Sequence, residues 1–306
     1  MPEPSDPGAR PDALEVPELA TGRLDGRVAI VTGAGSANGM AGTGAAISIV
    51  LAARGARVVL ADVDRDRAEH TREAVERVGG EGRAEVVDVT DAAACADVCE
   101  RTRRDLGSLD ILVNNAAIAP REEEFDVDSW SRIIALNLTG PMQMMAGALP
   151  AMRAQRKGSI VNITSISALQ AGGGEAYTAA KSGLRGLGRA MALREGPNGI
   201  RVNDVAPGHV AIPMGLGFQG WAGDLSAGER TRRRRAFATM LGTEGTGWDV
   251  ANAVAFLAGD ESAYVTGVTI PVDGGTTGVF PLVMWQRINE REDAYSAGVG
   301  GAGTEE

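Results

Sequence analysis

A glycine-rich stretch between two short apolar segments constrains the fold of this chain more than any other feature. Residues 27–32 are typical of a buried strand, and the chain then runs through GAGSANGMAGTG at residues 33–44 into a helical pattern that ends near residue 53. A second strand pattern follows at residues 57–62 and ends on an acid, Asp62. This order of strand, glycine loop, helix, strand and acid predicts one βαβ unit of a parallel sheet.

The same alternation continues along the chain. Further strands are predicted at residues 85–89, 109–117, 159–165, 199–205 and 264–272. Intervening helices are predicted at 64–78, after a cap at Thr90 or Asp91, at 129–152 and around Tyr177. We therefore expect an α/β fold, a Rossmann-like doubly wound parallel sheet of about seven strands with helices on both faces. Pro141 is expected to interrupt the helix at 129–152 and to free the carbonyl of Asn137.

The first βαβ unit predicts dinucleotide binding. Glycines let the backbone approach a pyrophosphate, and the N-terminus of the following helix offers unpaired N–H groups to it. Asp62 is expected to accept hydrogen bonds from the ribose hydroxyls of the adenosine. A 2′-phosphate there would meet a like charge, so NAD is favoured over NADP, although Arg65 lies close enough in sequence to weaken that preference.

Tyr177 and Lys181 are one helical turn apart and share a face. An ammonium at ~4 Å, at an effective dielectric near 20, favours a phenolate by ~4 kcal/mol, or roughly three pKa units, which would bring the phenol near pH 7. Lys157 and Lys181 are the only lysines, beside 28 arginines. Because the compact ammonium is retained here, an acid/base pair is favoured over the alternative of an unremarkable surface pair.

Composition excludes several functions. The net charge of −10 disfavours general nucleic-acid binding. Cys95 and Cys99 lack the spacing of a redox pair or a zinc site, and with two histidines in the chain we expect no metal. The sequence contains no run of about 18 apolar residues, so no membrane span is predicted. Residues 1–22 are acidic and proline-rich, resemble no signal peptide, and are expected to form a disordered or loosely docked arm; a cytoplasmic location is the default expectation.

Several motifs occur together in a characteristic order. They are Thr32-Gly33 with Gly42-x-Gly44, Asp62, Asp88-Val89, Asn114-Asn115-Ala116-Ala117, Asn137, Ser165, Tyr177-x-x-x-Lys181, Asn203, Pro207-Gly208 and Val272-Asp273-Gly274-Gly275. With these motifs the chain resembles the short-chain dehydrogenase/reductase family, in its short single-domain form, over residues 23–280. The resemblance implies one Rossmann-fold domain and a homo-oligomer, a tetramer or a dimer.

The resemblance also implies a role for each matching residue. Tyr177 would be the acid/base, Lys181 would depress its pKa and bind the nicotinamide ribose, Ser165 would hydrogen-bond the reacting oxygen, and Asn137 would hold a water that links Lys181 to solvent. The implied cofactor-binding residues are Gly33, Ser36, Gly42, Thr43, Gly44, Asp62, Asp88, Val89, Asn114, Ala116, Tyr177, Lys181, Pro207, Gly208 and Val210.

The chain departs from the family pattern in places. About five extra residues, near 37–41, lie beside the expected pyrophosphate, and we expect this insertion to fold over the cofactor and slow its release. The spacing from Ser165 to Tyr177 is one residue short, which leaves Thr164 or Ser167 as alternative hydroxyls. Ile212 stands where the family often has threonine. His209 is either a wall residue or a second acid/base.

The substrate lid is expected at residues 209–240. The basic run within it, Arg230 with the arginines 232–235, is either a solvated or subunit-contact face, or a landing site for a phosphate or CoA tail. Residues 281–306 extend beyond the family's usual end. The apolar stretch 279–293 is expected to pack across a subunit interface, and the Gly-rich stretch 297–306 to be disordered.

Together these features predict an NAD-dependent oxidoreductase that interconverts a secondary alcohol and a ketone, on an apolar or cyclic substrate. The enzymatic alternative is a 3-hydroxyacyl or 3-oxoacyl thioester oxidoreductase. The non-enzymatic alternative is an NAD-sensing scaffold, against which the complete set of Asn137, Ser165, Tyr177 and Lys181 argues.

Overall fold

The computed structural model describes residues 23–36, 41–119, 126–212 and 225–301. Its centre is a seven-stranded sheet in the order β3-β2-β1-β4-β5-β6-β9, in which every pairing is parallel. The strands are β1 (Val28–Thr32), β2 (Arg57–Asp62), β3 (Glu81–Val86), β4 (Ile111–Asn114), β5 (Gly158–Ile163), β6 (Ile200–Pro207) and β9 (Thr269–Val272). The predicted doubly wound α/β sheet is thus confirmed.

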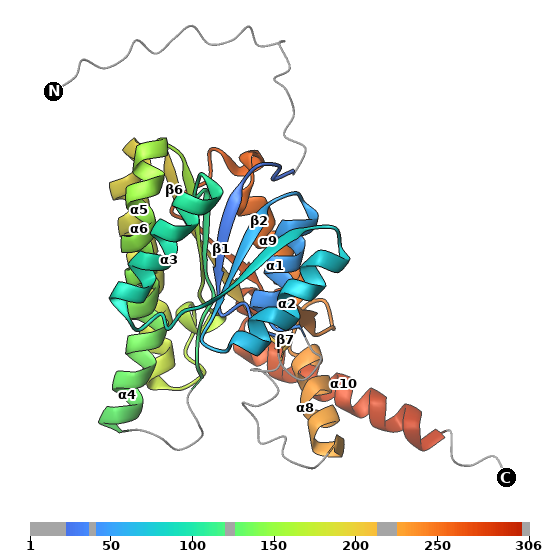
Figure 1. Cartoon of the computed structure of the whole chain (residues 1–306). Coiled ribbons are helices and arrows are strands. Elements are labelled where there is room, and N and C mark those ends of the chain that lie inside the picture. The colour runs from blue at the N-terminus through green and yellow to red at the C-terminus, as the bar shows by residue number, and fades with distance from the viewer. Residues whose placement is uncertain (1–22, 37–40, 120–125, 213–224, 302–306) are drawn as a thin grey trace, which may run out of the picture.

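Helices cover both faces of the sheet (Figure 1). One face carries α1 (Thr43–Ala53), α2 (Arg65–Arg77) and α9 (Gly247–Ala258); the other carries α3 (Ala92–Leu106), α5 (Gly140–Gln155) and α6 (Glu175–Glu195). Each face has its own buried apolar cluster, because the central strands are apolar on both sides. Asp91 caps α3 by accepting hydrogen bonds from the N–H groups of Ala93 and Ala94, as the sequence predicted.

The strand order reverses between β1 and β4. β1 pairs with β2 on one side and with β4 on the other. A crevice opens at such a switch point, beyond the carboxyl ends of the strands. The residues expected to bind ligand follow β1, β2, β4, β5 and β6 at this edge.

The third strand lies earlier than predicted. It occupies Glu81–Val86 rather than residues 85–89, because its register with β2 pairs Asp62 with Val86 and both strands end there. Val87 and Val89 are buried beyond the strand end, which explains why their apolar pattern resembled a strand. The last strand is shorter than predicted, and Tyr264, placed in it by the sequence, is fully exposed.

Pro141 does not break its helix. Asp126 caps α4 (Val127–Ile134), a π-helical turn follows at Ala135–Thr139, and α5 continues directly from it. The N–H of Gly140 donates to the carbonyl of Ala135. Proline lacks an N–H, and the wider turn accommodates it without ending the helix.

The remaining elements are short or lie near the carboxyl edge. They are the pair β7 (Val210–Ala211) and β8 (Gly245–Thr246), α8 (Leu225–Phe237), α10 (Pro281–Gly301) and the 3-10 turns Ile166–Ala168, Gly196–Asn198, Asp260–Ser262 and Thr276–Gly278. The helix α10 projects away from the body (Figure 1). It includes residues 297–301, so the prediction of disorder from residue 297 was wrong for that part. The predicted arm at residues 1–22 lies outside the described residues. No described helix is both long and apolar enough to cross a membrane.

Candidate active site

Two adjoining cavities lie at the carboxyl edge of the sheet. The larger has a volume of about 460 Å³ and the smaller about 330 Å³. Both are lined by Thr43, Asn115, Ala117 and Ile212, so they form one continuous cleft. The cleft spans the carboxyl ends of β2 to β6, as the sequence predicted.

The glycine loop forms a close-fitting cradle in the smaller cavity. A Cβ atom on Gly44 would lie 2.1 Å from the carbonyl oxygen of Gly33, and Gly33 itself has a φ of +61°. Asn115 Nδ2 donates to the carbonyls of Thr32 and Gly33, 2.9 Å from each. These contacts hold the loop open at the start of α1.

The first turn of α1 points its backbone N–H groups into this cradle. Gly42 occupies the N-cap position and no side chain caps the helix. Gly42, Thr43 and Gly44 all line the smaller cavity. An uncapped helix N-terminus in a side-chain-free cradle fits the pyrophosphate of a dinucleotide.

Asp62 lies at the end of β2 and lines the smaller cavity. Its two carboxylate oxygens accept from the N–H groups of Gly35, at 2.8 Å, and Asp64, at 3.0 Å. Arg65, which was expected to weaken the preference for NAD, is exposed and does not line the cavity. Arg67 lines it instead, and its guanidinium lies 3.2 Å from the Asp64 carboxylate.

Most of the other predicted cofactor-binding residues also line the cleft. Asp88, Val89 and Ala116 line the smaller cavity. The hydroxyl and N–H of Thr90 donate to the Asp88 carboxylate and lower its pKa. Ser36 does not line either cavity; its N–H donates to the carbonyl of Arg67.

Asn114 differs from its prediction. It is 2% exposed, and its amide donates to Asn162 within the sheet, so it does not reach the cleft. The following residue, Asn115, lines both cavities instead. Asn115 belongs to the same sequence motif as Asn114, but no role was predicted for it.

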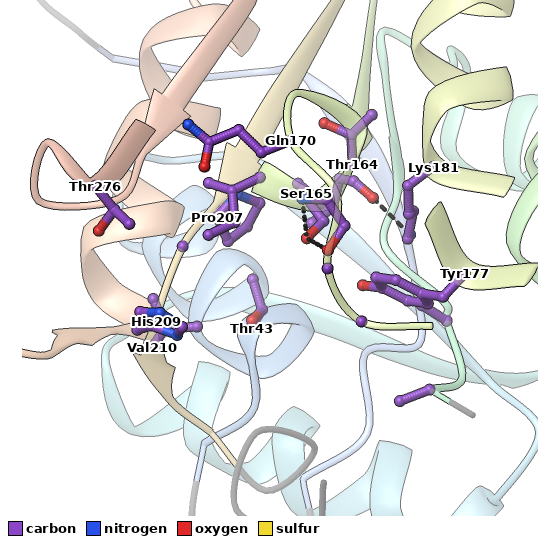
Figure 2. Close-up of a pocket in the computed structure, with 18 of the residues that line it drawn as sticks. Thr43, Thr164, Ser165, Gln170, Tyr177, Lys181, Pro207, His209, Val210 and Thr276 are labelled. Carbon is purple, nitrogen blue, oxygen red and sulfur yellow. Dashed lines mark hydrogen bonds between the residues drawn. The ribbon is translucent and has the colours of Figure 1, made fainter. Parts of the chain in front are cut away.

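Tyr177, Lys181 and Ser165 meet on one wall of the larger cavity (Figure 2). Tyr177 and Lys181 lie one turn apart on α6, and Ser165 follows the end of β5. The Lys181 ammonium is 5.6 Å from the centre of the Tyr177 ring and donates to the carbonyl of Ile163 at 2.8 Å. The phenol of Tyr177 points toward Ser165 (Figure 2).

The electrostatics of this group differ from the sequence-based estimate. Burial raises the pKa of Tyr177, while a hydrogen bond with Ser165 opposes that rise. Burial also lowers the pKa of Lys181 to about 8. Lys181 therefore does not bring the pKa of the phenol near 7, because desolvation is the largest effect on Tyr177.

The alternatives to Ser165 are narrowed by the structure. The Thr164 hydroxyl is buried and donates to the carbonyl of Val205, so it is engaged in the sheet. Ser167 lines the larger cavity, and its N–H donates to the Ser165 hydroxyl oxygen. Of Ser165 and Ser167, Ser165 lies nearer the end of β5, and the N–H at the start of the 3-10 turn fixes its hydroxyl oxygen.

Asn137 lies in the π-helical turn and is fully buried. Its side chain accepts from the N–H of Ile118 at 2.9 Å and donates to the carbonyl of Ile118 at 2.8 Å. It therefore anchors the loop that follows β4. Its predicted role of holding a water next to Lys181 stays a prediction.

The opposite wall of the larger cavity comes mostly from later in the chain. Pro207, Gly208 and Val210 line the cavity as predicted, together with His209, Arg235 and Thr276, and Gln170 lines it as well. Burial, and to a lesser extent the nearby charge of Arg235, lower the pKa of His209. His209 is therefore a largely neutral wall residue near neutral pH.

The arginine run does not form one basic surface. Arg232 lies 2.9 Å from Glu244, and Arg233 lies 3.4 Å from Glu292 on α10. Arg235 turns toward the larger cavity. The inserted residues 37–40 and the part of the lid at residues 213–224 lie outside the described residues. Within the described chain, no group of three metal-ligating side chains is found.

A parallel sheet with a glycine cradle beside a Ser-Tyr-Lys group defines a dinucleotide-dependent oxidoreductase of the Rossmann type. A family model described as enoyl-(acyl carrier protein) reductase matches residues 35–277. The chain belongs to the short-chain dehydrogenase/reductase family.

Characterised proteins share most of the length of this chain. The cis-4-hydroxycyclohexanecarboxylate dehydrogenase of Sinomonas cyclohexanicum is 38% identical over 83% of this chain and 97% of its own. The 3-oxoacyl-acyl-carrier-protein reductase FabG of Escherichia coli is 36% identical over 82% and 98%. The crystal structure of carveol dehydrogenase from Mycobacterium avium in complex with NAD matches with a TM-score of 0.77 at 31% identity, over 85% of this chain and all of that one.

Proposed function

We propose that this protein is an NAD-dependent oxidoreductase that interconverts a secondary alcohol and a ketone. The observation that carries the proposal is the meeting of Ser165, Tyr177 and Lys181 on one cavity wall, next to the cavity that Asp62 lines. The apolar part of the larger cavity, which includes Ile166 and Ala171, supports a compact apolar or cyclic substrate.

Each polar side chain has one task in the reaction. In the oxidising direction, the Tyr177 oxygen takes the proton of the alcohol, and the Ser165 hydroxyl hydrogen-bonds the same substrate oxygen. The Lys181 ammonium stabilises the phenolate that accepts this proton. A nicotinamide cofactor, when bound, would supply the hydride chemistry.

The preference for NAD follows from Asp62. Its carboxylate oxygens already accept backbone N–H groups, and each retains a lone pair for a ribose hydroxyl. A 2′-phosphate would add about −1.5 to −2 charges beside a carboxylate. The solved relative that binds NAD supports this choice.

The second candidate is a 3-oxoacyl thioester reductase, which the relationship to FabG favours. The third is an NAD-sensing scaffold. The arginine run was the sequence's hint of a CoA tail, but Arg232 and Arg233 form ion pairs with Glu244 and Glu292. The alcohol dehydrogenase assignment is therefore preferred.

The test follows the absorbance of reduced nicotinamide with secondary alcohols, diols and 3-hydroxyacyl thioesters, using NAD and NADP in parallel. Tyr177→Phe should lower kcat by about 10²- to 10⁴-fold, because the acid/base is removed. Tyr264→Phe is the matched control, since Tyr264 is fully exposed. Equal activity in the Tyr177→Phe protein, or tight cofactor binding without turnover of any class, would contradict the proposal.

A further inference from the structure

The larger cavity has an asymmetric charge. Of the described residues that line it, Lys181 and Arg235 carry positive charge and none is acidic. His209 contributes little positive charge, because burial lowers its pKa. The smaller cavity differs, since two acids, Asp62 and Asp88, line it together with Arg67.

The two cations belong to opposite sides of the larger cavity. Lys181 is on α6 beside Tyr177, whereas Arg235 is on α8 and lies 3.6 Å from Glu244. The residue after Glu244, Gly245, donates its N–H to the carbonyl of His209 at 3.1 Å, which places Arg235 near the His209 segment. The end of α8 packs near Thr276, whose hydroxyl donates to the carbonyl of Ala238 at 3.4 Å. Figure 2 shows His209 and Thr276 across the cavity from Tyr177. Arg235 is thus placed to bind a part of the substrate remote from the reacting carbon.

The Arg235 guanidinium is held in position from behind. Its side chain is 11% exposed, and Nη1 lies 3.6 Å from Glu244 Oε1. Glu244 does not line the cavity and lies closer to Arg232, at 2.9 Å. The nearby Asp273 carboxylate accepts hydrogen bonds from Gly275 and Thr277 and does not line the cavity either.

We propose that Arg235 binds a carboxylate of the substrate, so that the substrate is a hydroxy acid, or the matching keto acid, on a compact apolar frame. This inference rests on the proposed oxidoreductase function. The planar guanidinium matches a carboxylate with two parallel hydrogen bonds. Glu244 balances the charge of Arg235 from outside the cavity, and a substrate carboxylate would pair with Arg235 from within the cavity that it lines. The carboxylate substrate named for the Sinomonas relative agrees with this chemistry.

The test compares an acid with its neutral analogue, in Arg235→Met and in a matched control. The probes are 4-hydroxycyclohexanecarboxylate and 4-hydroxycyclohexanecarboxamide, which have similar shapes. Arg235→Met should lower the ratio of kcat/KM for the acid to kcat/KM for the amide by about 10- to 100-fold, mainly through KM, because charge-assisted hydrogen bonds are lost. Arg232→Met also removes a partner of Glu244 but no cavity charge. Its ratio should stay within about twofold of the wild-type ratio.

Two kinetic results would overturn the inference. One is a wild-type enzyme that turns over the amide as well as the acid. The other is an equal loss of selectivity in Arg232→Met and Arg235→Met, since Arg235 would then act through Glu244.

If the wild-type enzyme turns over neither probe, calorimetry tests the inference instead. It compares the affinities of cyclohexanecarboxylate and cyclohexanecarboxamide for the enzyme–NAD complex. Equal affinities refute a carboxylate site, whereas a preference for the acid that Arg235→Met abolishes supports it. Failure to oxidise any alcohol with NAD or NADP speaks against the proposed function instead, and is separate from this binding result.

Discussion

Replacing Asp204 by asparagine should stabilise this protein at neutral pH. Asp204 lies on β6, is 2% exposed, and accepts hydrogen bonds from Asn162 at 3.0 Å and Thr269 at 3.2 Å. Gly188 of α6 covers it, and a Cβ atom there would lie 2.6 Å from Asp204 Oδ1. Burial raises the pKa of this carboxyl from 3.8 to about 6, against the opposing effect of the two hydrogen bonds.

The sign and size follow from linkage. Because the folded pKa lies above the unfolded pKa, the folded state binds more protons between the two values, and stability falls as the pH rises through about 6. A difference of about 2 in pKa corresponds to roughly 3 kcal/mol above pH 7. Asparagine keeps the shape without the charge. Its carbonyl accepts from Asn162, and its amide donates to the Thr269 hydroxyl, which can accept as well as donate.

The assay is denaturant unfolding at a fixed protein concentration, at about pH 4.5 and about pH 8. The gain in unfolding free energy of Asp204→Asn over the wild type should widen by ~2 kcal/mol between these two conditions. Asp97→Asn is the control, because it removes a charge from an exposed side chain on α3 and its effect should be small at both pH values. A gain that is the same at both pH values would refute the reasoning, since Asp204 would then not titrate near pH 6.

Three further predictions concern the cofactor and the subunit contacts. Asp62→Ser should raise kcat/KM for NADP relative to NAD by at least about tenfold, because a carboxylate no longer faces the 2′-phosphate; an unchanged ratio in initial-rate kinetics would contradict this. Gly44→Ala should weaken NAD binding measured by calorimetry, because its Cβ would lie 2.1 Å from the Gly33 carbonyl, whereas Gly186→Ala meets no atom within 4 Å and should bind normally. A protein ending at Gly278 should form an assembly of fewer subunits, measured by light scattering, because it lacks the half-exposed apolar residues at the start of α10. An unchanged number of subunits would exclude that surface as a subunit contact.

The sheet was predictable from sequence because its signals are local. Apolar runs bounded by glycine or acid identify buried parallel strands, and the ends of parallel strands meet at one edge. Strand ends were less predictable, and the site depends on them. Asn114 and Asn115 are adjacent asparagines, but Asn114 is the last residue of β4 and points into the sheet, while Asn115 is the first residue beyond it. Alternate residues of a strand face opposite sides, so an error of one position changes the assigned role.

Long-range properties were not predictable from the local pattern. The pKa of Tyr177 depends on how far α6, β5 and the cavity wall remove it from water, and no spacing in the sequence measures that. The distinct position of Arg235 depends on its helical phase and on Glu244, which lies beyond the end of α8. From the sequence alone, the four arginines 232–235 could not be distinguished as anion-binding residues.

The retention of lysine can be judged position by position. Lys181 is 2% exposed, and its ammonium fits between the Tyr177 ring and the carbonyl of Ile163. A guanidinium is wider and stays charged, whereas the pKa of this ammonium is lowered to about 8. Lys157 is half-exposed, at 52%, and pairs with Asp260, where Arg27 already binds the same carboxylate. An arginine would serve equally there, so the rarity of lysine supports a chemical role for Lys181 alone.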